Sequence, residues 1–133
     1  MGTDHDRVKA ARGLLRAIEQ GDTRSLLASY AENEVQVEHP NRLKPKGDRR
    51  GPAKMAEDLA RGKQLLAEEH CEVIEAVATG DNVAMQLNWT GVLAVPVGTL
   101  KAGETMTCES AVFLRFQGDR IVEQHNHDCF PPF

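Results

Sequence analysis

The chain has 133 residues, of which 41% are hydrophobic and 27% are charged, a size and composition that predict one globular domain over residues 1–133. Its formal charge of -4 argues against nucleic-acid and anionic-membrane partners, which require a basic surface. The sequence contains no apolar run of membrane-spanning length and begins without the apolar core of a signal peptide. We therefore expect a cytoplasmic protein.

Apolar residues recur with helical spacing in the first half of the chain. They do so over residues 8–18, and Gly21 follows where a left-handed cap would end that helix. The spacing then predicts a short second helix that carries Tyr30. Pro52 suits the first turn of a third helix whose inner face extends to Leu66.

Strand-like patterns occupy most of the remaining sequence. A first strand, between the second and third helices, contains Val35, Val37 and His39 and stops at Pro40. From Cys71 onward the hydrophobic period is two, and strand-like runs cover about 71–79, 82–95, 105–117 and 120–130. Helices followed by an antiparallel meander predict an α+β domain with helices on one face of the sheet.

The cysteines and short motifs give little sign of a cofactor. Cys71, Cys108 and Cys129 lack CxxC spacing, which predicts free and mostly buried thiols. The sequence contains no glycine-rich nucleotide loop, GxSxG or HExxH. We expect no cofactor and no metal, although His125 and His127 are an alternative pair of metal ligands together with Cys129.

Several short segments resemble one known family. The AIEQGD break after the first helix, the VEHP strand end and the closing FLRFQGDRIVEQHNHDCF resemble the SnoaL-like branch of the nuclear-transport-factor-2-like, or ketosteroid-isomerase-like, superfamily. The resemblance implies a cone: a strongly curved, mixed and mostly antiparallel sheet with three N-terminal helices in its concave face. It also implies a pocket for a small apolar or aromatic molecule and a homodimer through the convex sheet face.

The resemblance leaves two classes of function open. The superfamily includes cofactor-independent isomerases, cyclases, dehydratases and hydrolases, and also proteins of the same fold that only bind ligands or dimerise. In the steroid isomerase pattern, His39 matches the general base, whereas Leu14 and Val112 match the two oxyanion donors. Neither Leu14 nor Val112 can donate, and one missing donor typically costs ~10²–10³ in rate. The pattern therefore disfavours steroid isomerisation, and Arg115 and Asp128 are unsuitably spaced for a limonene-type epoxide hydrolase.

Alternation along the last strand, matched to the family at its turn, predicts the catalytic face. It places Val122, Gln124, Asn126 and Asp128 toward the cone interior, and Ile121, Glu123, His125 and His127 toward the convex face. We expect Asp128 and His39 to form an acid/base pair. The expected ligand-binding residues are Gln124, Asn126, Trp89, Met85, Leu14, Tyr30, Val112 and Ser110.

Other interpretations of these residues stay open at this stage. His39 is alternatively a ligand contact or a structural residue, and Asp128 alternatively bonds only backbone amides or a histidine. The basic loop 40–51 is either a lid or anion-attracting rim, or a solvated loop paired with Glu68 and Glu69. On the neighbouring strand, the residues expected to alternate outward at a dimer interface are Glu109, Ala111, Phe113 and Arg115.

Overall fold

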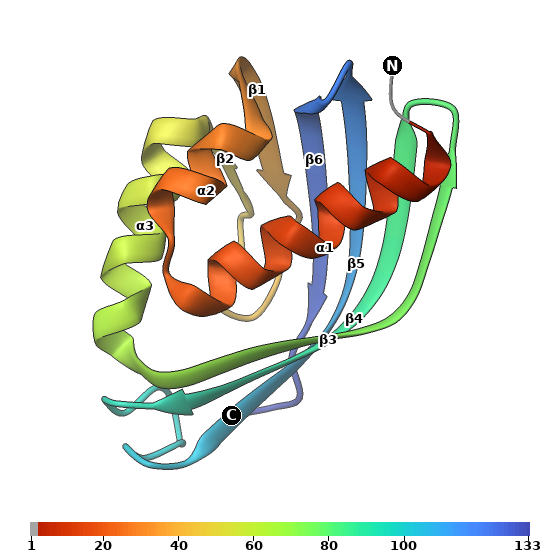
Figure 1. Ribbon diagram of the computed structural model, residues 1–133. Helices are drawn as coiled ribbons and strands as arrows, with labels where there is room; N and C mark the ends of the chain where they lie inside the picture. The colour runs from red at the N-terminus through yellow and green to blue at the C-terminus, as the bar shows by residue number, and fades with distance from the viewer. Residues whose placement is uncertain (1–2) are drawn as a thin grey trace.

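The computed structural model describes residues 3–133, which form three helices and one six-stranded sheet (Figure 1). The helices are α1 (Asp4–Gln20), α2 (Thr23–Ser29) and α3 (Pro52–Leu65). The strands are β1 (Tyr30–Glu38), β2 (Asp48–Arg50), β3 (Leu66–Thr79), β4 (Asn82–Leu93), β5 (Thr105–Gln117) and β6 (Arg120–Cys129). In this part of the chain, no helix has both the length and the apolar composition needed to cross a membrane.

The sheet has the strand order β2-β1-β6-β5-β4-β3 and bends strongly around the helices (Figure 1). β1 runs parallel to β6, and the other neighbouring strands are antiparallel. α1 crosses the concave face over β3 and β4, while α2 and α3 lie at the β1 end. The predicted α+β cone with a mixed, mostly antiparallel sheet is therefore confirmed.

Local sequence signals hold α1 in place at both ends. At the N-terminus, the Thr3 hydroxyl accepts from the Asp6 amide and the Asp6 carboxylate accepts from the Thr3 amide, a reciprocal cap. At the C-terminus, Gly21 adopts a φ of 67°, which glycine tolerates best. The buried Arg7 donates to the Gly80 carbonyl, so α1 is anchored to the β3–β4 turn.

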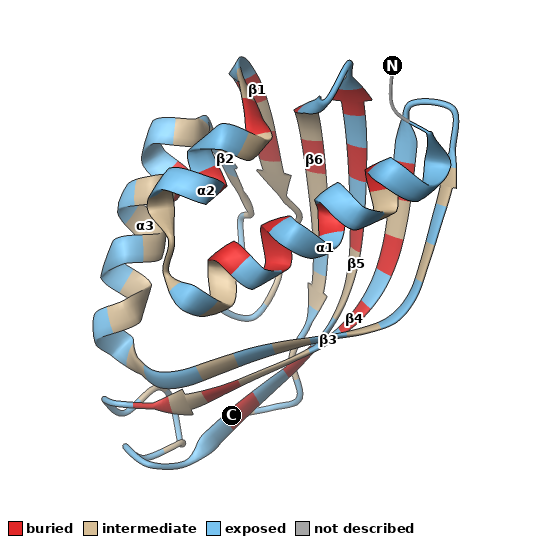
Figure 2. Cartoon of the chain, viewed as in Figure 1, coloured by how far each residue is buried: buried red, intermediate tan, exposed pale blue. Residues whose placement is uncertain are grey.

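The hydrophobic core lies between α1 and the concave face of the sheet (Figure 2). Leu14 of α1 is only 1% exposed, and so are Val83, Leu114 and Ile121 on three different strands. These side chains belong to one core cluster that also contains Tyr30. Because burial of each large apolar side chain contributes roughly 1.5–3 kcal/mol, this cluster stabilises the packing of α1 on the sheet.

Three element boundaries differ from the sequence-based prediction. Tyr30 begins β1 instead of ending the second helix, and β2 lies within the predicted loop 40–51. β3 begins at Leu66, five residues before the predicted strand, because Leu66–His70 pair with the end of β4. The charged sequence of that stretch masks its alternation.

A β-bulge changes the predicted faces at the start of β6. Arg115 pairs with Glu123 and Phe116 pairs with Ile121, so Val122 is an extra residue on β6. Ile121 is therefore buried in the core, and Val122 lines a groove on the convex face. The prediction that Val122 faces inward and Ile121 outward was wrong, whereas the alternation from Gln124 onward is as predicted.

Candidate functional site

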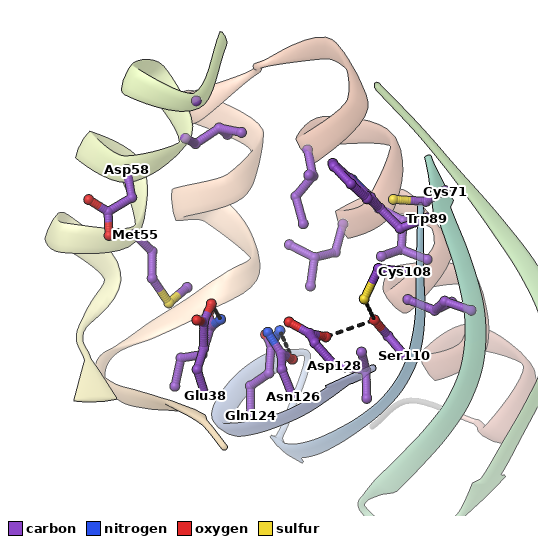
Figure 3. A pocket seen from close by; sticks show the side chains of 18 of the residues that line it. Glu38, Met55, Asp58, Cys71, Trp89, Cys108, Ser110, Gln124, Asn126 and Asp128 are labelled. Carbon is purple, nitrogen blue, oxygen red and sulfur yellow. Dashed lines mark hydrogen bonds between the residues drawn. The ribbon is translucent and has the colours of Figure 1, made fainter. Parts of the chain in front are cut away.

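A cavity of about 320 Å³ lies between the concave face of the sheet and the helices (Figure 3). One part of its wall is apolar, with side chains from α1, α3 and β4. The opposite wall carries polar side chains of β1, β5 and β6. The polar ones labelled along this wall in Figure 3 are Glu38, Gln124, Asn126, Asp128 and Ser110. Such a cavity suits a small, mostly apolar molecule with a few polar groups.

The ligand-binding residues expected from the sequence come together in this cavity. Its lining includes Gln124, Asn126, Trp89, Met85, Leu14, Tyr30, Val112 and Ser110, and also Asp128. These side chains come from α1 and from strands β1, β4, β5 and β6. For the residues of β4, β5 and β6 this place in the wall agrees with the predicted alternation, and the roles of all of them in binding stay predictions.

His39 does not line this cavity, so its predicted pairing with Asp128 was wrong. β1 buries Glu34 and Gln36 and places Glu38 in the cavity wall, so the next residue, His39, lies on the convex side. Side chains of a strand alternate between faces, and a shift of one residue exchanges them. Glu38 occupies the inner position that the family pattern suggested for His39.

On the convex side His39 joins two other histidines. Its Nε2 lies 2.9 Å from Nδ1 of His125, and its ring stacks on His127 with a centroid distance of 4.0 Å. Desolvation lowers the pKa of His39, and the charges of His127 and His125 lower it further. A proton on His39 is therefore disfavoured both by burial and by repulsion from the two neighbouring rings.

The histidine cluster does not have the arrangement of a metal site. Stacked rings direct their nitrogens along parallel planes instead of toward one point. Among residues 3–133, no group of three His, Cys, Asp or Glu side chains is placed to hold a metal ion. The alternative site formed by His125, His127 and Cys129 therefore finds no support in the structure. The three cysteines are free, but Cys129 is exposed, contrary to the expectation of mostly buried thiols.

Asp128 belongs to a short polar chain across β5 and β6. The Ser110 hydroxyl donates to Asp128 Oδ1 at 2.7 Å, and the Cys108 sulfur lies 3.4 Å from the same hydroxyl (Figure 3). Burial raises the pKa of Cys108 to about 11, so its sulfur remains a neutral thiol. Ser110 therefore orients the carboxylate without adding a charge beside it.

A second series of hydrogen bonds links Tyr30 to the cavity. The Tyr30 hydroxyl donates to Gln124 Oε1 at 2.6 Å, and Gln124 Nε2 donates to Asn126 Oδ1 at 2.9 Å. Tyr30 is 2% exposed, and burial together with the charge of Glu34 raises its pKa far above the ordinary range. The phenol keeps its proton at all physiological pH values and acts as a donor.

Two basic residues that pair with the cavity-wall carboxylate Glu38 were not singled out by the sequence analysis. Arg50 of β2 donates to Glu38 at 2.7 Å and to Asp58 of α3 at 2.6 Å. Lys44 lies 3.4 Å from Glu38 and donates to Asp48. Two of the five basic residues of loop 40–51, Lys44 and Arg50, are therefore paired with carboxylates of the loop, β1 and α3. Their partners are not the expected Glu68 and Glu69.

A third charged group positions the tryptophan. Glu69 accepts from Trp89 Nε1 at 3.0 Å and is paired with Lys63 at 3.1 Å. Burial and the nearby charges of Glu69 and Glu19 raise the pKa of Cys71, beside Trp89, to about 12. The hydrogen bond to Glu69 therefore fixes the orientation of the indole ring, and the apolar surface of the ring faces the cavity.

A sequence signal for the missed residues existed in β1 but conflicted with hydrophobicity. The polar residues Glu34, Gln36 and Glu38 share one face, and Val35 and Val37 share the other with His39. Valines normally face a core, which is why their side was taken as the inner one. Arg50, Asp58 and Glu69 reach the cavity through tertiary contacts that no local spacing encodes.

Comparisons with known proteins place this geometry in a family. Curated proteins give no significant match. Among solved structures, the chain is similar to AclR of Streptomyces galilaeus, provisionally assigned as a hydroxylase, with TM-score 0.78 and 16% identity over 95% of this chain and 76% of that one. It is also similar to IdmH of Streptomyces antibioticus, provisionally assigned as a polyketide cyclase. The TM-score is 0.78, with 21% identity over 92% of this chain and 91% of that one.

An LEH-like epoxide hydrolase of Mycobacterium tuberculosis has TM-score 0.72 and 16% identity over 96% of this chain and 84% of its own. At these identities the structural similarity shows the fold alone. The sequence model of the SnoaL-like domain matches residues 11–124, which is most of the chain. The protein therefore belongs to the SnoaL-like domain family.

Proposed function

We propose that the protein binds a small, largely apolar molecule in the cavity and that Asp128 transfers a proton to and from it without a cofactor. The observation that carries this proposal is the distribution of cations. Within the described residues, Asp128 is the one carboxylate in the cavity wall without a cationic partner. The provisional cyclase assignment of IdmH is consistent with such chemistry.

The other carboxylates of the cavity wall are held by cations. Glu38 pairs with Arg50 and Lys44, and Glu69 pairs with Lys63. Burial raises the pKa of Asp58, but hydrogen bonds from Arg50 and Lys54 outweigh it, so that pKa is lower than usual. A carboxylate held by cations is a weaker base than one beside a neutral hydroxyl.

The proposed reaction step follows from this difference. Asp128 takes a proton from an acidic C–H group of the bound molecule, and the C–H electron pair moves into the ligand. Ser110 keeps the second carboxylate oxygen aligned. The apolar side chains of the wall hold the rest of the molecule beside the carboxylate. Return of the proton to another atom of the ligand completes an isomerisation or a cyclisation.

A generic proton-abstraction probe tests this proposal without knowledge of the natural substrate. 5-Nitrobenzisoxazole is flat and aromatic, and removal of its ring C–H proton breaks the N–O bond and releases a coloured phenolate. We expect turnover above background in the wild type and a loss of roughly 10² or more in Asp128→Asn, the scale of a lost general base. Asp119→Asn, in an exposed turn, is the matched control. Equal rates in Asp128→Asn and wild type would contradict the proposal.

A second function is favoured by one observation. The positions that match the isomerase oxyanion donors are Leu14 and Val112, which line the cavity but donate no hydrogen bond. A protein that binds a ligand and does not turn it over is consistent with this. Saturable binding of aromatic molecules, with no turnover of the probe above background, would favour this function.

We further propose a cytoplasmic homodimer through the convex sheet face. Phe113 on β5 is 48% exposed and contacts the edge of His127, and Val77 on β3 is 54% exposed. Val35 and Val37 also lie on this face. Covering these apolar side chains with a second copy removes them from water. Light scattering at micromolar concentration should give about twice the chain mass of 14.6 kDa, and a monomer would refute the dimer.

A further inference from the structure

The inner face of α3 lacks a side chain at one position of the cavity wall. The residues of α3 that line the cavity are Met55, Asp58, Leu59 and Gly62, which follow one another at helical spacing. Residues three or four apart share one face of a helix. The same spacing continues to Leu66 at the start of β3, which also lines the cavity. Gly62 therefore lies on the inner face of α3, between two leucines.

The fold itself does not require a glycine at this position. α3 runs without a break from Pro52 to Leu65, and the φ of Gly62 is not positive, so its backbone conformation suits any residue. Among residues 3–133, a Cβ atom added at Gly62 would meet no heavy atom within 4 Å outside its own stretch of helix. Glycine inside a helix is less stable than alanine, because it loses more backbone entropy on folding. Gly62 therefore leaves open space, which we call the α3 gap, and destabilises the helix.

A second glycine has the same local properties without contact with the cavity. Gly13 lies inside α1, and a Cβ atom added there would likewise meet no described atom within 4 Å. It is exposed, whereas the α1 residues in the cavity wall are Leu14, Leu15 and Ile18. Substitutions at Gly13 and at Gly62 therefore have equal effects on a helix, and only those at Gly62 change the cavity.

The surroundings of the α3 gap are apolar. Leu59 and Leu66 flank it along the inner face. Asp58, the polar residue of this face, is turned to Arg50, with 2.6 Å between its Oδ2 and the guanidinium. Figure 3 shows α3 on one side of the cavity and the carboxylate of Asp128 across from it. A ligand that reaches from one side to the other therefore meets polar groups at the β6 end and hydrocarbon at the α3 end.

We infer that the α3 gap is a subsite for an uncharged alkyl or ring substituent, which lies against the backbone of α3 at Gly62 while the polar end of the ligand lies toward β6. The missing side chain sets the largest substituent that the cavity accepts, so Gly62 is a specificity-determining residue. The inference rests on the proposed binding of a largely apolar molecule in the cavity. It adds a subsite and a limit on the length of the ligand.

Thermal unfolding tests whether the α3 gap is open. Gly62→Ala and Gly13→Ala should each raise the melting temperature by about 2–5 °C, because alanine favours the helix and its methyl group meets no atom at either position. A lower melting temperature in Gly62→Ala, together with the expected rise in Gly13→Ala, would show that the wall is closed at this point and would overturn the subsite.

A series of 4-alkylbenzyl alcohols measures the size of the subsite. Benzyl alcohol, 4-ethylbenzyl alcohol and 4-butylbenzyl alcohol share one polar end and one ring and differ only in the alkyl chain. In the wild type, calorimetry should show affinity rising by up to about fourfold per methylene, the gain expected on full burial. Affinity for the butyl compound should fall roughly 3- to 10-fold in Gly62→Ala and roughly tenfold or more in Gly62→Leu, because a side chain then occupies the gap.

The shortest compound and the second glycine are the controls. Benzyl alcohol does not reach the gap, so its affinity should change by less than about twofold in Gly62→Leu, which also shows that the variant is folded. Gly13→Leu should leave all three affinities within about twofold of the wild type. Equal affinity of Gly62→Leu and the wild type for the butyl compound would overturn the subsite. A wild type that binds benzyl alcohol as tightly as the butyl compound would overturn it as well.

These results are distinguishable from a failure of the proposed proton transfer. Selectivity for chain length depends on Gly62, whereas turnover of 5-nitrobenzisoxazole depends on Asp128. Selectivity that is lost in Gly62→Leu, with no turnover of the probe by the wild type, would support the subsite and refute proton transfer. Turnover that depends on Asp128, with the same chain-length selectivity in Gly62→Leu and the wild type, would support proton transfer and refute the subsite.

Discussion

The two faces of the β1–β6 pair are built from neighbouring residues and have opposite chemistry. On the concave face, Glu38, Asn126 and Asp128 line the cavity. On the convex face, His39, His125 and His127 contact one another. Each residue of the first set directly adjoins one of the second set in sequence. A one-residue difference in register therefore decides whether a carboxylate or an imidazole faces the ligand.

The faces also differ in how their charges are compensated. The inner carboxylates Glu38 and Asp58 share the guanidinium of Arg50, and hydrogen bonds hold each in one direction. On the outer face, burial lowers the pKa of His39, and the charges of His127 and His125 lower it further. Charge pairs therefore hold the inner carboxylates, whereas His39 on the outer face is a neutral ring at neutral pH.

The largest expected effect comes from comparing one substitution on each face. Asp128→Asn should lower turnover of 5-nitrobenzisoxazole by roughly 10²–10⁴, since a general base is lost. His39→Asn should leave turnover within about twofold, because its ring lies outside the cavity wall. Steady-state rates at pH 7.5 measure both. A large loss in His39→Asn with none in Asp128→Asn would reverse the comparison of the two faces.

The second prediction concerns Glu34, the inner-face carboxylate that lacks a hydrogen-bond partner. Glu34 is 2% exposed, and burial raises its pKa from 4.5 to about 8 against the opposing charge of Arg50. The folded state therefore retains a proton that the unfolded state releases, so stability falls as pH rises from about 4.5 to about 8. Glu34→Gln removes this penalty.

We expect Glu34→Gln to raise the free energy of unfolding by roughly 1–3 kcal/mol at pH 9 and by little at pH 5, given ~1.4 kcal/mol per pKa unit. Urea denaturation at both pH values measures the difference. Glu32→Gln, an exposed neighbour on β1, is the control and should give no such pH dependence. A Glu34→Gln effect of equal size at both pH values would argue for a packing cause.

These two faces also show what a sequence does and does not reveal. The fold was predictable because the helical and strand periods are clear over most of the chain, and the inward residues of β6 from Gln124 onward followed from alternation. In β1, alternation was clear but its direction was not, because Val35 and Val37 are on the convex side and Gln36 is buried. Which side of a strand faces the cavity depends on its partners in space, and one sequence does not contain that information.

The cation pairs of the site escaped prediction for a related reason. Arg50 meets Asp58 across a helix–strand contact, and Lys63 of α3 meets Glu69 of β3 beyond the helix end. Such pairs depend on how α3 packs against the sheet. As a result, sequence reasoning identified Asp128 as a carboxylate in the pocket, but only the structure shows that, among residues 3–133, it is the cavity-wall carboxylate without a cationic partner.

The third prediction sharpens the description of the apolar part of the concave face. Trp89→Phe keeps an aromatic ring but loses the hydrogen bond to Glu69, and Trp89→Leu loses the ring as well. We expect affinity for a flat aromatic molecule to fall a few-fold in Trp89→Phe and roughly tenfold in Trp89→Leu, in line with lost apolar contact area. Calorimetry measures both. Unchanged affinity in Trp89→Leu would place the ligand outside this cavity.

The smallest expected effect is on the convex face and depends on pH. Besides His39, His125 and His127, the charged groups facing this cluster are Arg49 of β2, Arg115 of β5 and Glu123 of β6. Hydrogen bonds from Arg115 and His125 lower the pKa of Glu123, so this carboxylate stays ionised through mild acid and compensates one positive charge.

Because burial and the charges of His127 and His125 lower the pKa of His39 from 6.5, this ring is neutral at pH 7.5 and takes up its proton below pH 6.5. Any stability or dimer contact that needs neutral rings is therefore complete above about 6.5 and is lost on acidification. If the convex face forms the dimer, protonation at low pH adds positive charge to each chain at the twofold contact, and the two chains repel each other. Light scattering should show partial dissociation at pH 5 and a full dimer at pH 7.5. His39→Asn should dissociate less at pH 5, whereas a dimer of equal strength at both pH values would place the histidine cluster outside the interface.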